Sequence, residues 1–156
     1  VRKAYTDTLS DTDLNTRRLP DGVEIKKAVL EPTRIYVRSI LDALEAELPI
    51  KACAHITGGG ITENLNRVLP QGLDALITLG SWEVPAIIQE VAKATKLDDH
   101  ELLRTFNMGI GMAVICASEA LAEVTESLLG SGNQVFLIGE IVAAEMEDIE
   151  GRVIYC

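Results

Sequence analysis

The sequence lacks long apolar runs and has few basic residues. No apolar stretch reaches the roughly 20 residues that a membrane-spanning helix needs, and residues 1–5 carry no apolar segment of the signal-peptide kind. The sequence has 14 lysines and arginines and 24 aspartates and glutamates, so the formal net charge is −10. This balance gives no counterion-release drive toward nucleic acid and repels an anionic membrane surface. We therefore expect a cytoplasmic protein that binds neither nucleic acid nor membrane, although a local basic cleft could still hold a small anion.

Cysteine is scarce, and several common catalytic patterns are missing. Cys53, Cys116 and Cys156 are far apart and outside any C-x-x-C pair, which indicates neither a disulfide framework nor a zinc site, so we expect reduced, mostly structural thiols. The chain offers no Ser-His-Asp arrangement, no G-x-S-x-G elbow and no Walker-type glycine loop. Asp11 and Asp13 have a metal-like spacing, but without a third carboxylate nearby they favour a helix cap, and we predict no metal site.

Length and patterning predict one domain. A chain of 156 residues, 47% of them hydrophobic, can form a single packed core, so residues 1–156 are expected to be one domain. Helical periodicity alternates with short apolar runs, which predicts an α/β (α+β) fold with a mixed sheet covered by helices. Helices are expected within 1–22 and at 35–48, 61–69, 84–96, 101–106 and 119–129, and strands at 51–57, 73–79, 107–117, 135–142 and 151–155. A turn at 19–22 and helix caps at Asp98 or Asp99 and at Ser118 complete the pattern.

The helix expected at 35–48 is amphipathic. Its apolar residues recur at helical spacing, whereas acidic residues occupy the side expected to be wet, and Pro49 closes the segment. The apolar residues are Ile40, Leu41, Leu44 and Leu48, and the acidic ones are Asp42, Glu45 and Glu47.

A glycine-rich loop gives the strongest local signal. Thr57 is followed by Gly58, Gly59 and Gly60, which open onto a helix. Consecutive glycines let backbone N–H groups approach a ligand closely, and a helix start adds its positive dipole end, a combination that suits phosphate or carboxylate. The side chains of Thr57, Asn64 and Arg67 could orient or neutralise such an anion. A plain tight turn between strand and helix explains the same residues equally well.

Two further positions leave alternatives open. Because alternate residues of a strand face opposite sides, His55 could be a satisfied core residue or an acid–base group beside the glycine loop. Gly109 and Gly111 do not form a dinucleotide fingerprint, since the third glycine is missing and the glycines precede the strand. They could let a ligand approach the backbone, with Asn107 supplying its amide, or they could mark a bulge.

Three separated segments resemble one enzyme family. They are Glu31-Pro-Thr-Arg-Ile-Tyr-Val37, Ala54-His-Ile-Thr-Gly-Gly-Gly-Ile-Thr-Glu-Asn64 running on to Pro70, and Arg104-Thr-Phe-Asn-Met-Gly-Ile-Gly-Met112. In this order they resemble the C-terminal half of the phosphoribosylformylglycinamidine cyclo-ligases, also called aminoimidazole ribonucleotide synthetases. The resemblance implies that the N-terminal half, which in this family binds most of the ATP and metal, is absent. Val1 in place of an initiator methionine agrees with a processed or cut chain.

The resemblance implies an ATP-dependent ring closure in purine synthesis. It implies a small-molecule nucleotide substrate, ATP and Mg²⁺ held mainly by the N-terminal half, a homodimer in the full-length enzyme, and an isolated half that folds without turnover. It also implies a catalytic role for His55, which could bond the iminophosphate oxygen or the leaving phosphate. Substrate- or phosphate-binding roles are implied for Thr57, Gly58, Gly59, Gly60, Asn64, Arg34, Asn107 and Gly109. Alternatives are a domain of another superfamily member, such as an amidotransferase or small-molecule kinase, and a standalone binding module.

Two positions depart from the patterns of these relatives. Asn66 stands where the cyclo-ligases have proline, and Ile56 stands where the related amidotransferase has aspartate. The second departure implies that the loop of this chain uses no carboxylate at that point.

Overall fold

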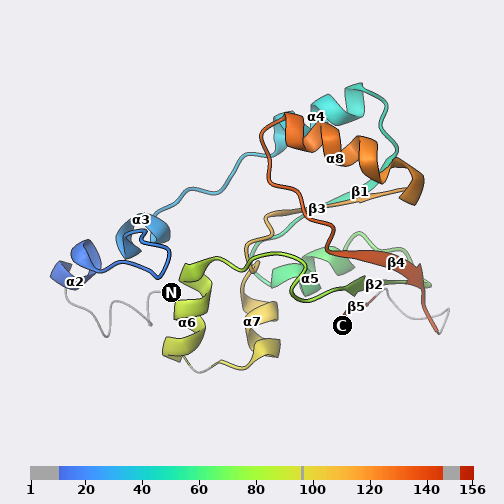
Figure 1. Ribbon diagram of the computed structural model, residues 1–156. Helices are drawn as coiled ribbons and strands as arrows, with labels where there is room; N and C mark the ends of the chain where they lie inside the picture. The colour runs from blue at the N-terminus through green and yellow to red at the C-terminus, as the bar shows by residue number, and fades with distance from the viewer. Residues whose placement is uncertain (1–10, 96, 146–151) are drawn as a thin grey trace.

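The computed structural model describes residues 11–95, 97–145 and 152–156, and it places two small sheets among short helices (Figure 1). The helices are α2 (Asp11–Thr16), α3 (Ile25–Val29), α4 (Val37–Glu45), α5 (Gly60–Asn66), α6 (Ala86–Thr95), α7 (Asp99–Thr105), the 3₁₀ turn η1 (Ser118–Ala120) and α8 (Leu121–Gly130). The strands are β1 (Ile50–His55), β2 (Leu73–Ile77), β3 (Met112–Cys116), β4 (Gly139–Ala143) and β5 (Val153–Tyr155). Helices and strands alternate along most of the chain, which confirms the predicted α/β class.

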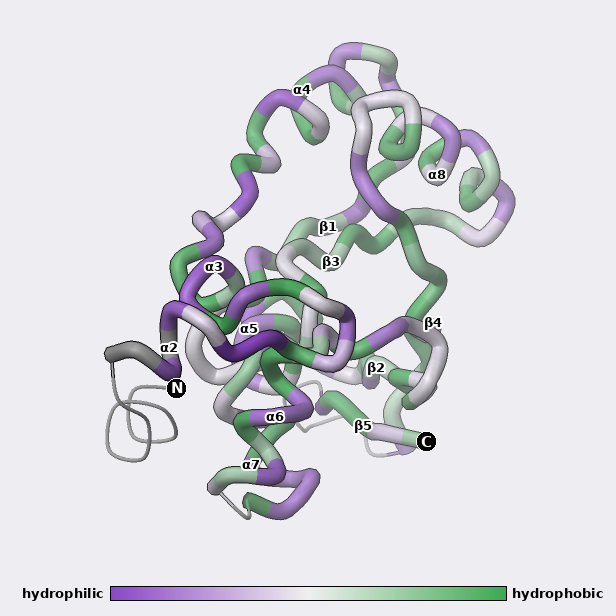
Figure 2. The backbone as a smooth tube through the Cα atoms, turned by 60° about the vertical axis from the view of Figure 1, so that its left-hand side comes forward, coloured by the Kyte–Doolittle hydropathy of each residue, from purple (hydrophilic) through white to green (hydrophobic). Residues whose placement is uncertain are grey.

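The strands form two separate sheets. β1 and β3 pair antiparallel, with His55 opposite Met112 and Ile50 opposite Cys116. In the second sheet β2 lies in the middle, antiparallel to β4 and parallel to β5, so this sheet is the mixed one. Figures 1 and 2 show α4 and α8 on one side of the β1–β3 pair and the β2 sheet on the other.

Two apolar cores correspond to this layering. The alternation of β1 places Ala54 in the core, and Ile56 just after the strand is only 2% exposed. They pack with residues of α5 and β2 and with Trp82 in the larger core, whose buried members are Ala54, Ile56, Ile61, Leu65, Ala75, Ile77, Trp82, Ile110 and Ala113. A second core lies between α4, α8 and the other face of the β1–β3 pair, and its buried members are Ala43, Leu48, Ala120, Val124 and Leu128.

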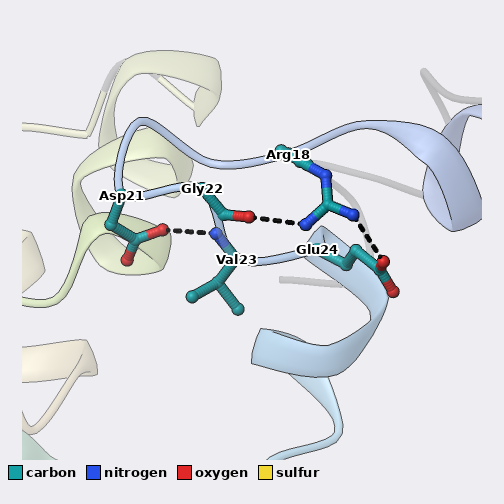
Figure 3. Close-up of polar contacts among 5 residues, drawn as sticks. All are labelled: Arg18, Asp21, Gly22, Val23 and Glu24. Carbon is teal, nitrogen blue, oxygen red and sulfur yellow. Dashed lines mark hydrogen bonds and ion pairs between the residues drawn. The ribbon is translucent and has the colours of Figure 1, made fainter.

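The chain enters α3 through the predicted turn at 19–22. The Gly22 amide donates to the Leu19 carbonyl at 2.8 Å, and Arg18 bonds both the Gly22 carbonyl and the Glu24 carboxylate at 2.8 and 2.9 Å (Figure 3). The Asp21 carboxylate accepts from the Val23 amide at 2.9 Å, the local side-chain-to-backbone bond that makes aspartate a turn residue. The turn is therefore confirmed, whereas α3 itself was not predicted.

Several boundaries differ from those expected. The glycines at 109 and 111 lie in the turn before β3 and not in the strand, and β4 begins at Gly139, four residues later than predicted. The predicted cap at Ser118 is wrong, because its hydroxyl bonds the Glu119 carboxylate at 3.0 Å and the residue already belongs to η1. Asp98 does cap α7, accepting from the Glu101 amide at 2.8 Å.

The expected apolar face of α4 is only partly buried. Ser39 and Ala43 point toward α8, and Leu48 beyond the helix is buried, but Leu41 and Leu44 are 48% and 47% exposed. α8 covers the side of α4 that carries its small residues, so the larger apolar side chains remain open to solvent. Their exposure leaves an uncovered apolar surface next to the segment 30–37, where Leu30 and Ile35 are also exposed.

The contact between α5 and α7 depends on glycine at the first position of α5. Gly60 has φ +62°, and a Cβ there would overlap the Leu103 carbonyl and lie 2.8 Å from the Phe106 carbonyl oxygen. Gly58, two residues earlier, has no neighbouring atom within 4 Å of the position that a Cβ would take. Gly60 is therefore required for close packing, whereas Gly58 lies in an open part of the loop.

Gly60→Ala should lower the free energy of unfolding by about 3 kcal/mol, because it adds left-handed backbone strain to a clash with fixed carbonyls. Gly58→Ala is the matched control and should change it by less than about 1 kcal/mol. Urea unfolding followed by Trp82 fluorescence measures both. Equal effects of the two substitutions would contradict the close packing at Gly60.

An ion pair ties β2 to the start of β5. The Asp74 side chain is 3% exposed and accepts from the Arg152 amide at 2.9 Å and from its guanidinium at 2.8 Å. These hydrogen bonds from the Arg152 side chain and backbone hold the pKa of Asp74 below its ordinary value of 3.8. Because the folded pKa is depressed, the contribution to stability is present above the unfolded pKa and is lost as pH falls through the folded pKa.

Asp74→Asn should therefore destabilise the chain at pH 7 but less so in acid. The difference in unfolding free energy between the native chain and the variant should shrink as pH falls from about 4 toward the lower pKa of the folded protein. Urea titrations at pH 7, 4 and 3 give this difference directly. Parallel loss of stability in both proteins would show that the pair carries no pH-dependent stability.

Candidate functional site

The glycine loop follows β1 and is held in place by Asn64. The Asn64 side chain is buried, and its amide nitrogen donates to the carbonyls of Gly58 and Gly60 at 3.1 and 2.8 Å. Its oxygen lies 3.4 Å from the Thr57 hydroxyl, which donates to it. Asn64 therefore faces the loop from the protein side, and the geometry makes it a positioning residue for the loop. The helix that follows continues regularly through Asn66, where the related cyclo-ligase pattern has proline.

The two sides of this loop differ in access. Gly59 has φ +93°, and the Glu63 side chain folds against it, where its carboxylate lies 3.8 Å from the Arg104 guanidinium. Thr57 and Gly58 are exposed, and Gly58 has open space around it. A ligand would therefore meet the loop at Thr57 and Gly58, away from the Glu63 carboxylate.

His55 lies at the end of β1 and is exposed, so the alternative of a core histidine is wrong. Its ring meets the Tyr36 ring edge to face, with the centroids 6.1 Å apart and an interplanar angle of 62°. The Tyr36 hydroxyl in turn lies directly over Gly111, where any Cβ would overlap it. Tyr36, His55 and Gly111 come one each from the three segments that carried the family resemblance, and the fold brings them together.

Asn107 and Gly109, the two residues predicted to matter before β3, both take part in the turn there. Met108 and Gly109 have φ +53° and +96°, the Ile110 amide donates to the Asn107 carbonyl at 2.9 Å, and the Gly109 amide donates to the Asn107 side chain at 3.1 Å. A Cβ on Gly109 would lie 2.5 Å from the Pro85 ring, so glycine is needed for close packing as well as for the turn. The Trp82 indole fixes the turn from the core side by donating to the Met108 carbonyl at 2.9 Å. The feature is a tight turn and not a bulge.

Arg34 lies apart from the glycine loop. Its guanidinium donates to the Gly132 carbonyl at 2.6 Å, which joins the segment before α4 to the end of α8. Arg34 and Gly109 both line a cavity of about 260 Å³, whereas none of the residues Thr57 to Gly60 does. The predicted site residues therefore form two groups, one at His55 and the loop and one at the cavity.

Sequence reasoning missed Tyr36 as a site residue. Tyr36 lies in the segment Glu31–Val37, in which the residues alone single out the charged Arg34. The signal that could have found it is the pairing of an aromatic residue with a glycine in another segment, since Gly111 leaves room for the phenol. That pairing becomes visible only in three dimensions.

The remaining ionisable groups do not assemble a metal site in the part of the chain that the structure describes, where no cluster of three histidine, cysteine or acidic side chains occurs. Burial raises the pKa of the Cys53 and Cys116 thiols, which disfavours the reactive thiolate. Burial also raises the pKa of Tyr155, although its hydroxyl shares a 2.8 Å hydrogen bond with Thr62 of α5. Among the described residues no helix has the length and apolarity needed to span a membrane.

Family comparison agrees with the geometry. Residues 4–151 match the family described as AIR synthase related protein, C-terminal domain, and the chain belongs to that family. The phosphoribosylformylglycinamidine cyclo-ligase of Albidiferax ferrireducens is 46% identical over 128 residues, which cover 82% of this chain and 36% of that protein. The enzyme of the same name from Trichlorobacter lovleyi is 41% identical over 137 residues, 87% of this chain and 39% of that protein. A relative from Vigna unguiculata, named as chloroplastic/mitochondrial, is 45% identical over 122 residues, 78% of this chain and 31% of that protein.

These matches define what the chain covers. It spans between about 31% and 39% of the length of the curated relatives given above, within a domain that the family description calls C-terminal. The three segments first recognised by their residues lie inside the matched range of the family. The resemblance drawn from the sequence is thus confirmed at the level of the family.

Asn64→Ala should lower the free energy of unfolding by about 2–3 kcal/mol, because it removes the buried partner of two carbonyls and a hydroxyl. Asn66→Ala, on the same helix but exposed, is the matched control and should stay within about 0.5 kcal/mol of the native chain. Chemical denaturation measures both. If both variants were equally stable, Asn64 would not be what holds the loop.

Proposed function

We propose that this chain is the C-terminal part of a cyclo-ligase that closes the imidazole ring of aminoimidazole ribonucleotide, using ATP, in purine biosynthesis. The observation that carries the proposal is the meeting of Tyr36, His55 and Gly111 beside an open glycine loop. The names of the relatives support the reaction, and their greater length supports a two-part enzyme in which an N-terminal part completes the site.

The proposed chemistry begins at the formamide oxygen of formylglycinamidine ribonucleotide. ATP supplies a phosphoryl group to that oxygen, the amidine nitrogen then attacks the resulting iminophosphate carbon, and phosphate leaves as the ring closes. The described residues contain no acidic cluster for Mg²⁺, and Glu63 places a carboxylate against one side of the loop. We therefore assign the binding of ATP and Mg²⁺ mainly to the N-terminal part.

This chain's own residues would hold and polarise the substrate. His55 is exposed at a strand end with its ring oriented by Tyr36, so it can bond the iminophosphate oxygen or the leaving phosphate. The Thr57 hydroxyl and the open backbone at Gly58 can receive the ribose phosphate or the transferred phosphoryl. Asn64 holds the loop, and the turn at Asn107 and Gly109 leads into Gly111, which packs on Tyr36. Ile56 is buried, which agrees with a loop that uses no carboxylate there.

The uncovered apolar face of α4 suits the partner that this proposal requires. Val37, Leu41 and Leu44 are spaced along one side of the helix and are 63%, 48% and 47% exposed. Exposed apolar side chains gathered on one face are typical of a surface that another domain covers. We infer that the N-terminal part covers it, that the complete enzyme is a cytoplasmic homodimer, and that the chain alone folds without turnover.

The reaction is tested with the complete reading frame that contains this chain. Incubated with ATP, Mg²⁺ and formylglycinamidine ribonucleotide, it should form aminoimidazole ribonucleotide, separated by liquid chromatography, whereas residues 1–156 alone should form none.

His55→Gln should lower kcat by about 100-fold, the lower end of what acid–base groups contribute. His100→Gln, which alters the other histidine on an exposed stretch of α7, is the control and should leave kcat unchanged. Normal kcat in His55→Gln would remove His55 from the mechanism.

The loop has its own variant in the same assay. Gly58→Val places bulk in open space without a positive φ, so the fold should persist while KM for the ribonucleotide rises by about tenfold or more. Circular dichroism checks the fold. An unchanged KM in a folded variant would show that the substrate does not touch the loop at Gly58.

A further inference from the structure

A cavity separate from the glycine loop lies on the α4–α8 side of the molecule. It occupies about 260 Å³ between β3, α8, the first turn of α4 and the segment 133–139. Small-molecule sites commonly enclose roughly 300–1,000 Å³, so this cavity suits a compact ligand. The glycine loop contributes nothing to its walls.

The residues that line the cavity are mostly apolar, and one of them, Arg34, is charged. Val114 of β3, Leu128 of α8, Phe136 and Ile138 belong to the apolar part. Arg34 is the one lining residue that carries a charge at neutral pH, and no aspartate or glutamate lines the cavity. In a chain with a net charge of −10, such a lining is a local exception that favours an anion.

The guanidinium of Arg34 has more N–H donors than its one described hydrogen bond uses. One N–H bonds the Gly132 carbonyl, which fixes the group at the cavity, and a guanidinium carries five N–H donors. Among the ion pairs of the described residues none involves Arg34. Its fork can therefore receive a carboxylate, a planar group that guanidinium binds through two parallel hydrogen bonds.

A second polar group in the lining is incompletely bonded. The Asn133 amide nitrogen donates to the Ser39 hydroxyl and to the Leu128 carbonyl, both at 2.9 Å, so the orientation of the amide is fixed. Its oxygen is enclosed and, alone among the buried side-chain polar atoms of the described residues, has no donor. Because this oxygen is enclosed by protein, Asn133 is a fixed part of the cavity wall, and Arg34 is the group that the charge of a ligand would meet.

We propose that this cavity binds a small, mainly aromatic carboxylate, with its carboxylate on Arg34 and its ring system between β3 and α8. A ribonucleotide fits the lining poorly, because sugar hydroxyls would be left unpaired against Val114, Leu128 and Ile138. The cavity shares Tyr36, Gly109 and Gly111 with the surface proposed above, but neither His55 nor any of the residues 57–60 lines it, so the two binding sites can be tested separately. A ligand bound here would also contact α4, α8 and the segment 133–139 together.

The probe for this site is 2-naphthoate, with the uncharged 2-naphthamide as its matched partner. Isothermal titration of the 156-residue chain at pH 7 should show saturable binding of one naphthoate. Arg34→Gln, which removes the charge but keeps a polar side chain, should weaken naphthoate binding about tenfold and leave naphthamide binding unchanged. Arg38→Gln is the control, since Arg38 is exposed on α4 and pairs with Asp42, and it should bind naphthoate like the native chain.

The location is read from backbone amide resonances of the ¹⁵N-labelled chain. Naphthoate should shift the amides of Gly111 and Gly139, which line the cavity, and leave Gly58 unshifted. Thr125→Phe, which fills the cavity from α8, should abolish binding of both probes; if this variant fails to fold, the Arg34→Gln comparison decides. Absence of saturable binding, equal affinity in Arg34→Gln, or shifts confined to Gly58 and Gly59 would each overturn the proposal.

Discussion

The antiparallel pairing of β1 with β3 is the constraint on which the candidate site depends. It aligns His55 with Met112, and the pairing is extended past the strand end by the Ile56 amide, which donates to the Gly111 carbonyl at 2.9 Å. Residues far apart in the sequence are thereby fixed side by side. The loop after β1 and the turn before β3 must therefore lie at the same end of the pair. The two larger apolar cores pack against this pair, one on each face, and so stabilise the position of the site.

Close backbone approach is the second requirement, and Gly60, Gly109 and Gly111 meet it near the candidate site. Gly60 packs on carbonyls at the end of α7, Gly109 on the Pro85 ring, and Gly111 on the Tyr36 hydroxyl. In each case the neighbouring group occupies the space that a side chain would need. These contacts hold the loop after β1 against the end of α7, and the turn before β3 against Pro85 and against the segment before α4.

Local signals were sufficient to predict much of this architecture. The strand–glycine loop–helix unit, the Asp98 cap and the turn at 19–22 each rest on neighbours within a few residues, and each is confirmed. The errors come from longer-range effects. Leu41 and Leu44 follow helical periodicity yet stay exposed, because periodicity cannot tell which side of α4 the distant α8 will cover. The start of β4 depends on pairing with β2, and residues 135–137 have strand composition but pair with none of the described strands.

The site residues divide in the same way. The glycine loop and His55 were selected from residues adjacent in sequence, whereas the partner of His55, Tyr36, and the separation of Arg34 from the loop required the fold. Asn64 and Asn107 were expected to contact a ligand, and in the structure their amides bond the backbone of their own loops. A polar side chain within a motif can thus serve the shape of the site as well as its chemistry.

The most direct test is a crystal structure of the complete reading frame with formylglycinamidine ribonucleotide bound. The account predicts the ribonucleotide in contact with His55 and with the loop at Thr57 and Gly58, while Tyr36 still packs on the histidine ring. A ribonucleotide bound without contact to either His55 or the loop would contradict it.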